Sequence, residues 1–293
     1  MKVYSGVEQV KPFFDSFNDL YDIALDGDYS SWYDKGYWDG SLIPFFIIKD
    51  DIVVSNVSVA PMELVLNNKK VAVLQISTVM THPDYRMQGL SAYLMQYVMD
   101  KYKDQYEFMY LFANESVLDF YPKFGFTRVD ESSYKLKDIS FTERVNVQWK
   151  KLSPDKLEDL KLLEDIIQDH VLLSQKLAFK GTQSLAMFHF ISQFEESLYY
   201  CKELNCLVIM EYDGEVLSIY DVWSKDPFDW NYLIRCLVKK KTKEVQFFFI
   251  PDVDFDGKLE VQKDPFDDDA LFIYPNKREL LPEHFMFPIT SHY

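Results

Sequence analysis

Glycine, cysteine and long apolar runs are all scarce in this chain of 293 residues. It has 9 glycines, whereas aromatic residues make up 17% of the sequence. That balance favours ordered helices and strands over a disordered chain. No stretch approaches the roughly 20 apolar residues that a membrane helix needs. The first residues, MKVYSGVEQVKPFF, also lack the apolar run and cleavage site of a secretory signal. We therefore expect a cytoplasmic protein with no membrane partner.

The few cysteines do not form a recognisable framework. Cys201, Cys206 and Cys236 lack CxxC spacing, and the five histidines show no ligand spacing. Reduced, buried thiols in a cytosolic protein are the expectation. No metal cofactor is predicted.

Positive charge is also in deficit. The chain has 31 Lys and Arg residues against 47 Asp and Glu residues, which gives a net charge of −16. Such a field repels nucleic acid and attracts cationic small molecules or basic peptides. Simple solubility is the alternative explanation. We expect no nucleic-acid partner, and the sequence does not indicate an oligomeric state.

The length exceeds the usual size of one compact core, which favours two domains. We place their boundary near residue 140, where a polar, helix-rich segment begins, giving domains 1–140 and 141–293. In the first, helical spacing runs from Val10 to Ala24 and from Gly89 to Tyr102. Strands are expected on both sides of a turn at Asp50-Asp51, then at 71–80 and 107–113.

The second half is expected to be helical to about Leu198, followed by a hairpin with its turn at Asp213-Gly214. A helix at 230–240 and a strand at 244–250 come next. VLSIYDVW (216–223) echoes VLQISTVM (73–80), and each is followed by a proline, a helix and an aromatic strand. Either a duplication or a chance agreement of two strand–helix–strand units explains this echo.

The most informative stretch is VMTHPDYRMQGLSAYLM, in which a strand runs into a loop that opens a helix. Consecutive N–H groups at a helix start form a cradle for phosphate oxygens. Gly89 lets the backbone approach a ligand closely, Ser91 leaves room above the first turn, and Arg86 adds a positive charge suited to pyrophosphate.

Arg86-x-x-Gly89-x-Ser91, which follows Thr81-His82-Pro83, resembles the coenzyme A loop Q/R-x-x-G-x-G/A of the GNAT superfamily of N-acetyltransferases. Ser in the last small position, and Thr for the family's Val, are departures from the family pattern that bear on how tightly the loop packs on the pyrophosphate. The segment FYPKFGF (120–126) resembles the family's FYxKxGF motif at the expected distance. The resemblance covers residues 40–137 and implies an α/β (α+β) fold with a mixed, mostly antiparallel sheet, splayed at the cofactor. The second domain is then α+β, with a degenerate GNAT-like copy as one possibility.

The resemblance also implies a set of site residues. Acetyl-CoA would be the co-substrate, held by a bulge in strand 73–80 that leaves N–H groups near Val79 and Thr81 free to polarise the thioester. Tyr121 matches the family's general acid, with a core tyrosine as the structural alternative, and Asn114 matches a residue placed against the cofactor. The full set of cofactor-binding candidates is Val79, Met80, Thr81, Arg86, Met87, Gln88, Gly89, Leu90, Ser91 and Asn114.

The acceptor side and the base are less defined. Trp32, Tyr33 and Tyr37, interleaved with acidic residues, would suit an ammonium group, although a helix packing its aromatics on the sheet explains them as well. The base could be Glu63, a water chain or the terminal carboxylate of Tyr293, since in some two-domain relatives the chain end reaches the cleft.

Taken together, these residues predict acetyl transfer from acetyl-CoA to a primary amine of a small cationic acceptor. Two alternatives stay open: acetylation of a peptide or protein amine, and a binding module that senses acyl-CoA without turnover.

Overall fold

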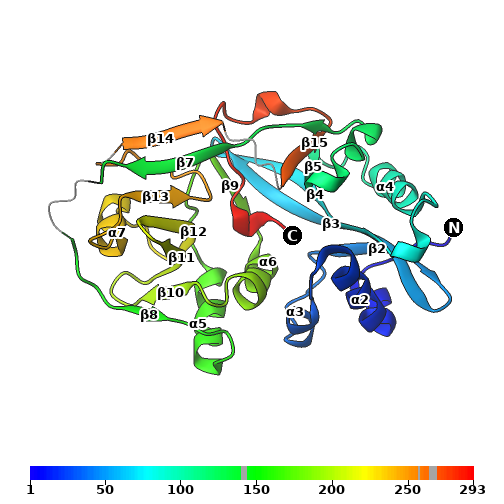
Figure 1. Cartoon of the computed structure of the whole chain (residues 1–293), viewed down its shortest axis with the longest axis horizontal. Helices are drawn as coiled ribbons and strands as arrows, with labels where there is room; N and C mark the ends of the chain where they lie inside the picture. The colour runs from blue at the N-terminus through cyan, green and yellow to red at the C-terminus, as the bar shows by residue number, and fades with distance from the viewer. Residues whose placement is uncertain (140–143, 257, 264–268) are drawn as a thin grey trace.

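The computed structural model describes residues 1–139, 144–256, 258–263 and 269–293. Two mixed, mostly antiparallel sheets lie beside each other (Figure 1). The first has eight strands in the order β1-β2-β3-β4-β5-β15-β6, with β9 pairing to the far end of β3. This mixed α/β architecture confirms the predicted fold class. Its strands are β1 Tyr4–Ser5, β2 Ile43–Lys49, β3 Ile52–Leu66, β4 Lys69–Thr81, β5 Phe108–Ala113, β6 Thr127–Arg128, β9 Leu177–Lys180 and β15 Ala270–Tyr274.

The second sheet has seven strands in the order β14-β7-β13-β12-β11-β10-β8. They are β7 Ser132–Lys137, β8 Trp149–Lys151, β10 Leu198–Cys201, β11 Cys206–Asp213, β12 Val216–Ser224, β13 Glu244–Phe247 and β14 Lys258–Lys263.

The two sheets exchange strands along the chain. β7 precedes the predicted boundary but belongs to the second sheet, whereas β9 and β15 follow it and belong to the first. A cut near residue 140 would therefore leave neither sheet complete. The boundary itself, between residues 140 and 141, lies outside the described residues, and the division into domains 1–140 and 141–293 stays a prediction.

Short left-handed turns connect the long antiparallel strands. The predicted turn at Asp50-Asp51 is confirmed, with φ angles of 50° and 62°, and Asn67-Asn68 repeats it at 48° and 65°. Asp and Asn tolerate this region better than most residues, and such turns match the twist of the flanking strands. In the β11–β12 hairpin Asp213 pairs with Val216. The two loop residues there are Gly214 and Glu215, one position later than predicted.

Helices flank both sheets, on their outer sides and in the space between the two halves (Figure 1). The helical spacing from Val10 to Ala24 becomes a helical run whose middle is tightened into a 3-10 turn at Pro12. The expected helical stretch up to Leu198 is wrong in part, because β8, β9 and the start of β10 interrupt it. The helices are α1 Val7–Val10, α2 Phe14–Leu25, α3 Ser30–Asp34, α4 Leu90–Lys101, α5 Leu157–Gln168, α6 Gln183–Phe188, the π-helical turn η5 His189–Gln193, and α7 Trp230–Leu237. The 3-10 turns are η1 Lys11–Phe13, η2 Pro83–Tyr85, η3 Glu115–Val117, η4 Tyr121–Phe124, η6 Arg278–Leu280 and η7 Ile289–Ser291.

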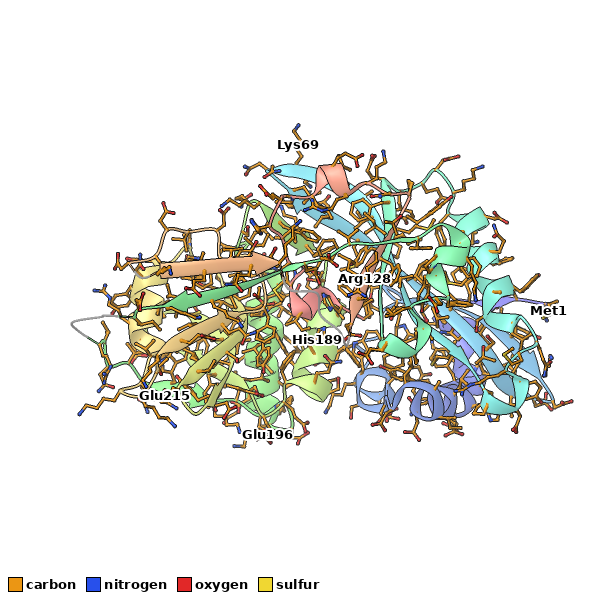
Figure 2. The ribbon with its side chains drawn as sticks, turned by 45° about the horizontal axis from the view of Figure 1, so that its top comes forward. Met1, Lys69, Arg128, His189, Glu196 and Glu215 are labelled. Carbon is orange, nitrogen blue, oxygen red and sulfur yellow. The ribbon has the colours of Figure 1, made fainter. Side chains whose placement is uncertain are left out.

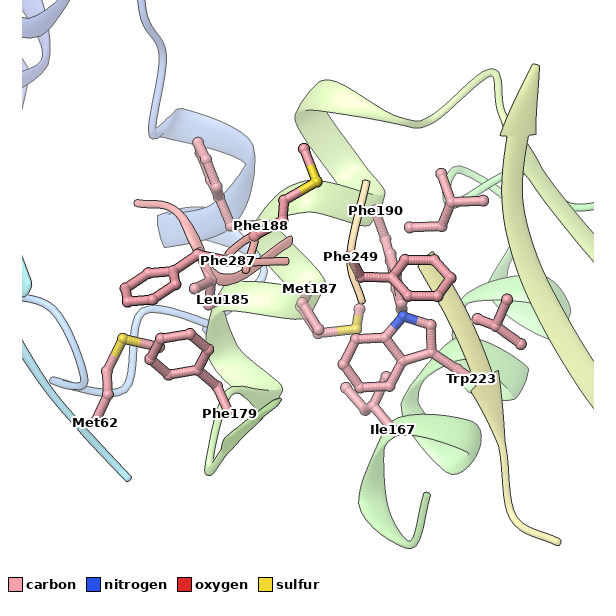
Figure 3. Packing of buried hydrophobic residues seen from close by; sticks show 14 of the residues in the cluster. Met62, Ile167, Phe179, Leu185, Met187, Phe188, Phe190, Trp223, Phe249 and Phe287 are labelled. Atoms are coloured by element: carbon pink, nitrogen blue, oxygen red, sulfur yellow. The ribbon is translucent and has the colours of Figure 1, made fainter. Parts of the chain in front are cut away.

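Two hydrophobic clusters hold the first sheet. One lies between the sheet and α4. The other continues without a break into the second half, where Met62 of β3, Phe287 near the chain end and Trp223 of β12 belong to one core (Figure 3). Full burial of such side chains contributes roughly 1.5–3 kcal/mol each. The two halves are thus joined by a shared core as well as by exchanged strands. No helix among the described residues is long and apolar enough to cross a membrane.

Two buried carboxyl groups form hydrogen bonds with the last ten residues of the chain. Glu131 Oε1 accepts a hydrogen bond from the Phe287 N–H at 2.7 Å. Asp221 accepts from the Thr290 hydroxyl and, at 2.8 Å, from the Val222 N–H. Burial raises the pKa of Glu131 to about 8, with a further contribution from the Asp269 carboxylate, and it raises the pKa of Asp221 to about 7.

These carboxyl groups predict how stability depends on pH. Their folded pKa values lie above the ordinary values, so between about pH 4 and 8 the folded chain keeps protons that the unfolded chain releases. The free energy of unfolding should fall by a few kcal/mol, to order of magnitude, as pH rises from about 5 to 8. Urea denaturation of wild type and of the Glu131→Gln/Asp221→Asn double variant, at a series of pH values, measures this change in the free energy of unfolding. The double variant should lose most of this slope, and parallel profiles would contradict the assignment.

Candidate active site

The first sheet opens where β4 and β5 diverge. Their parallel pairing is limited to Val73–Gln75 against Phe108–Tyr110. Beyond that point β4 continues for six residues without β5 beside it. An open cavity of about 860 Å³ lies there. Its walls come from β4, the following loop, the start of α4, the end of β5, η4, α2 and the last residue of the chain.

The predicted bulge in β4 lies at this opening. Asn56 of β3 pairs with Met80 and Ser58 pairs with Ser77, so Thr78 and Val79 stand opposite a single residue. Thr78 has a φ of 43°, which is uncommon for a β-branched side chain. The buried Asn56 side chain supports this conformation by donating to the Thr78 carbonyl at 2.8 Å. The bulge therefore takes β4 out of register beside the cavity.

The loop after β4 presents a row of free N–H groups. Gly89 caps α4 with a φ of 74°, and the first backbone bond of the helix runs from the Tyr93 N–H to the Gly89 carbonyl at 2.9 Å. Within the described part of the chain, the N–H groups of residues 87–92 donate to no protein acceptor. Together with the positive end of the helix dipole, they form an anion cradle. Arg86 lies beside it, with its Nε donating to the Thr81 carbonyl at 3.2 Å.

Serine at the last small position of the loop makes a specific contact. Ser91 Oγ lies 2.5 Å from Thr81 Oγ1, which is also 2.9 Å from Ser55 Oγ. The two departures from the family pattern, Thr81 and Ser91, thus bond to each other. Their hydroxyl groups tie the start of α4 to the end of β4.

Tyr121 lies at the base of the same cavity. It opens η4, and its side chain is 5% exposed, packed against Phe120, Phe126 and Phe272. Among the described residues no hydrogen-bond partner contacts its hydroxyl. Burial raises the pKa of Tyr121 to about 12. The hydroxyl therefore carries its proton at neutral pH, as a general acid must.

Asn114 directly follows β5 and begins the turn that leads to Tyr121. Its Oδ1 accepts from the Ser116 N–H at 3.1 Å and from the Ser116 hydroxyl at 2.6 Å. Asn114 thereby caps the segment that follows β5, which forms two 3-10 turns. Gly125, with a φ of 87°, ends η4 in the left-handed conformation and so keeps this turn short.

The end of the chain lies at the opening of β4 (Figure 1). Ser77 Oγ donates to the main-chain oxygen of Tyr293 at 2.8 Å, and the Tyr293 hydroxyl lies 2.8 Å from Ser41 Oγ. With its amide turned to satisfy both atoms, Gln75 accepts from the Tyr293 N–H at 3.1 Å and donates to the Ser291 carbonyl at 3.3 Å. Three polar contacts to β4 thus hold the last residues beside the cavity.

The aromatic segment after α2 packs mainly as a core. Trp32 is 1% exposed and donates its Nε1 to the Ser184 carbonyl, while Tyr33 stacks on Phe14 at 3.9 Å between ring centroids. Neither residue lines the main cavity. Tyr37 lines a separate cavity of about 590 Å³ and donates to Glu164 at 2.6 Å. The role of these three aromatics in acceptor binding stays a prediction.

Nine of the ten cofactor-binding candidates line the main cavity, as do Tyr121 and Tyr293. The exception is Gln88, which accepts a hydrogen bond from Lys49 at 3.1 Å. Glu63, a candidate base, does not line the cavity and pairs with Lys70 near the β3–β4 turn. The sequence reasoning missed the α2 residues, Lys123 and Asp269. Lys123 stood within a quoted motif and could have been found there, whereas the others are brought in by the fold.

The second sheet repeats the arrangement without the anion cradle. β12 pairs in parallel with β13 over Val216–Ile219, and its register with β11 shifts next to Tyr220. The start of α7, however, is capped by its own chain: Asp229 Oδ1 accepts from the N–H groups of Asn231 and Tyr232 at 2.9 and 3.3 Å. A carboxylate therefore occupies the place where a phosphate would bind. The repeated geometry fits a duplication, which was one of the two explanations offered for the sequence echo and stays a prediction.

One coenzyme A site per chain is the expected result. The uncapped N–H groups before α4 are expected to bind the pyrophosphate, whereas the Asp229 carboxylate caps the corresponding helix start in the second half. Calorimetric titration with coenzyme A should give a stoichiometry of one. Two sites per chain would contradict this prediction and would indicate that the second half also binds.

Comparison with known proteins agrees with this geometry. Residues 13–129 match the model of an acetyltransferase (GNAT) domain family. No curated protein matches the sequence. Among solved structures, a conserved protein of unknown function from Enterococcus faecalis is similar, with a TM-score of 0.55, 14% identity, and coverage of 93% of this chain and 72% of that one. Eis1 from Mycobacterium abscessus gives a TM-score of 0.54 at 10% identity, covering 92% and 73%. A GCN5-related N-acetyltransferase from Kribbella flavida gives 0.53 at 14% identity, covering 93% and 70%. At these identities the structural likeness concerns the fold.

The family match agrees with the bulged β4 strand and with its divergence from β5. Residues 13–129 of this chain form an acetyltransferase (GNAT) domain.

Proposed function

We propose that this protein transfers an acetyl group from acetyl-CoA to a primary amine of a small cationic acceptor. The observation that carries the proposal is a single cavity bordered by both the free N–H row of residues 87–92 and the Tyr121 side chain. The first can hold pyrophosphate and the second can donate a proton, so both requirements of thioester aminolysis meet in one place.

The reaction follows from these positions. A neutral amine attacks the thioester carbonyl carbon, and N–H groups at the β4 bulge stabilise the charge that develops on the carbonyl oxygen. The carbon–sulfur bond then breaks, and the departing thiolate takes the proton of the Tyr121 hydroxyl. The new amide nitrogen loses its extra proton to a base, and Tyr121 is reprotonated from solvent.

Tyr293 is the favoured position for that base. Its main-chain oxygen accepts from Ser77 beside the bulge, whereas Glu63 lies outside the cavity and is paired with Lys70. In a chain that ends at Tyr293, this oxygen belongs to a carboxylate. Such a group would accept the proton directly or through a water molecule.

Charge supports a cationic acceptor. The chain carries a net charge of −16, and Asp39, Glu164 and Asp165 border the cavity that Tyr37 lines. A field of this sign raises the local concentration of polyamine-like or aminoglycoside-like cations.

An amine panel tests the acceptor class. Values of kcat/KM should be highest for small polycations, lower for neutral amines and lowest for peptide amines. For the polycations they should fall as salt is raised, because screening weakens attraction at long range. A preference for peptide N-termini or lysines would replace this acceptor class with a protein substrate.

A further inference from the structure

The opening between β12 and β13 in the second sheet is filled by the chain itself. The parallel pairing ends at Ile219, whose carbonyl accepts from the Phe248 N–H at 3.1 Å. The Phe248 carbonyl in turn accepts from the Ile289 N–H at 3.1 Å. The tail, defined here as residues 288–293, thus enters the second sheet at the place that corresponds to the coenzyme A site of the first.

A buried polar contact fixes the tail there. The Thr290 hydroxyl donates to Asp221 Oδ2, and the two residues are 4% and 5% exposed. Asp221 lies on β12 at the position that matches Thr78 in the echo between 216–223 and 73–80. A buried carboxyl group needs such a partner, because an unsatisfied polar group in the core costs free energy. Loss of the hydroxyl would leave that carboxylate with one fewer partner.

The tail then crosses to the first sheet. His189 of η5 donates from Nε2 to the His292 carbonyl at 2.9 Å, since a carbonyl can only accept. His189 lies next to the chain end in Figure 2. The His292 ring stacks on Phe112 of β5 at 3.6 Å between centroids. The next residue, Tyr293, reaches β4 through Ser77.

We infer that the splayed strands of the second sheet act as a receptor for the chain's own tail, and that Asp221 and Thr290 are positioning residues that hold Tyr293 beside the β4 bulge. The inference rests on the proposed function for its catalytic part. The second half then has a role in the reaction. The opening in the second sheet holds the tail and thereby sets the position of Tyr293 in the first site.

Thr290→Val tests the inference because it removes the hydroxyl and keeps the shape of the side chain. Hydrogen exchange in peptides that cover residues 285–293 should speed up by roughly tenfold or more, since the tail opens more often. Turnover (kcat) should fall by about tenfold, while the KM for acetyl-CoA stays within about twofold, because the cradle at residues 87–92 is untouched. Thr290→Ser, which keeps the hydroxyl, should restore both values.

Ser197→Ala is the matched control. It removes a buried hydroxyl that donates to Glu211 at 2.6 Å in the second half, away from the tail. Its melting temperature should fall as much as that of Thr290→Val, with normal kcat and tail exchange. If Thr290→Val does not fold, Thr290→Ala removes the same hydroxyl with a smaller side chain and should show the same losses.

The inference would be overturned if Thr290→Val showed the same tail exchange rate and the same kcat as Ser197→Ala. It would also be overturned if Thr290→Ser lost as much activity as Thr290→Val. Wild-type protein without turnover on any amine would refute the proposed function instead. The exchange measurement would still decide whether Asp221 and Thr290 hold the tail.

Discussion

Tyr121→Phe should lower turnover by on the order of 10²-fold or more, the usual contribution of a positioned acid. The substitution removes one oxygen and leaves the ring in contact with Phe120, Phe126 and Phe272. Because that hydroxyl has no protein partner among the described residues, no hydrogen bond within the fold is lost. Affinity for acetyl-CoA should stay within a few-fold of wild type. Thiol release and melting curves measure these effects.

Tyr102→Phe is the control for this experiment. Tyr102 belongs to the same buried cluster but does not line the cavity. Both variants should unfold at similar temperatures, and only Tyr121→Phe should lose activity. A folded Tyr121→Phe protein at the wild-type rate would show that Tyr121 is a core tyrosine and that the thiolate takes its proton from water.

Gly89→Glu should weaken acetyl-CoA binding by at least about tenfold. Its carboxylate would lie at the start of α4, where the free N–H groups are expected to bind pyrophosphate. The fold has room for a side chain at this position, because a Cβ at Gly89 meets no atom within 4 Å. The φ of 74° adds strain of roughly 1 kcal/mol for any side chain. Calorimetry with acetyl-CoA measures the loss.

Gly89→Gln separates charge from strain. Gln has the same backbone strain at this φ and nearly the same side-chain volume as Glu, but no negative charge. Affinity should therefore decrease in the order wild type, Gly89→Gln, Gly89→Glu. Equal affinity of wild type and Gly89→Glu would contradict the assignment of the cradle.

The features predicted correctly from sequence are those set by neighbouring residues. The turn at Asp50-Asp51 follows from two adjacent acidic residues between apolar runs, and it is present. The opening of α4 after Gly89 follows from a glycine before an apolar helical stripe. The β4 bulge came from the family resemblance, and the register shift opposite Val57 confirms it.

The missed features depend on contacts between distant segments. No local pattern indicates that β15 enters the first sheet next to β5, or that β7 leaves it for the second. The placement of Tyr293 beside Ser77, considered only as one candidate base, spans 216 positions in the sequence. The acceptor role of Trp32 and Tyr33, expected because aromatic faces beside carboxylates suit a cation, stays a prediction. In the fold, the Trp32 indole donates to the Ser184 carbonyl of α6, and the Tyr33 ring stacks on Phe14 of α2.

Coenzyme A release is the most direct test of acetyl transfer in this cleft. Wild-type protein, acetyl-CoA and a small polycationic amine should together yield free thiol, with the amine gaining one acetyl group by mass spectrometry. Omission of any one of the three should abolish thiol release above the uncatalysed background. Saturable binding of acetyl-CoA with no thiol released from any amine would contradict the account and identify the protein as an acyl-CoA sensor.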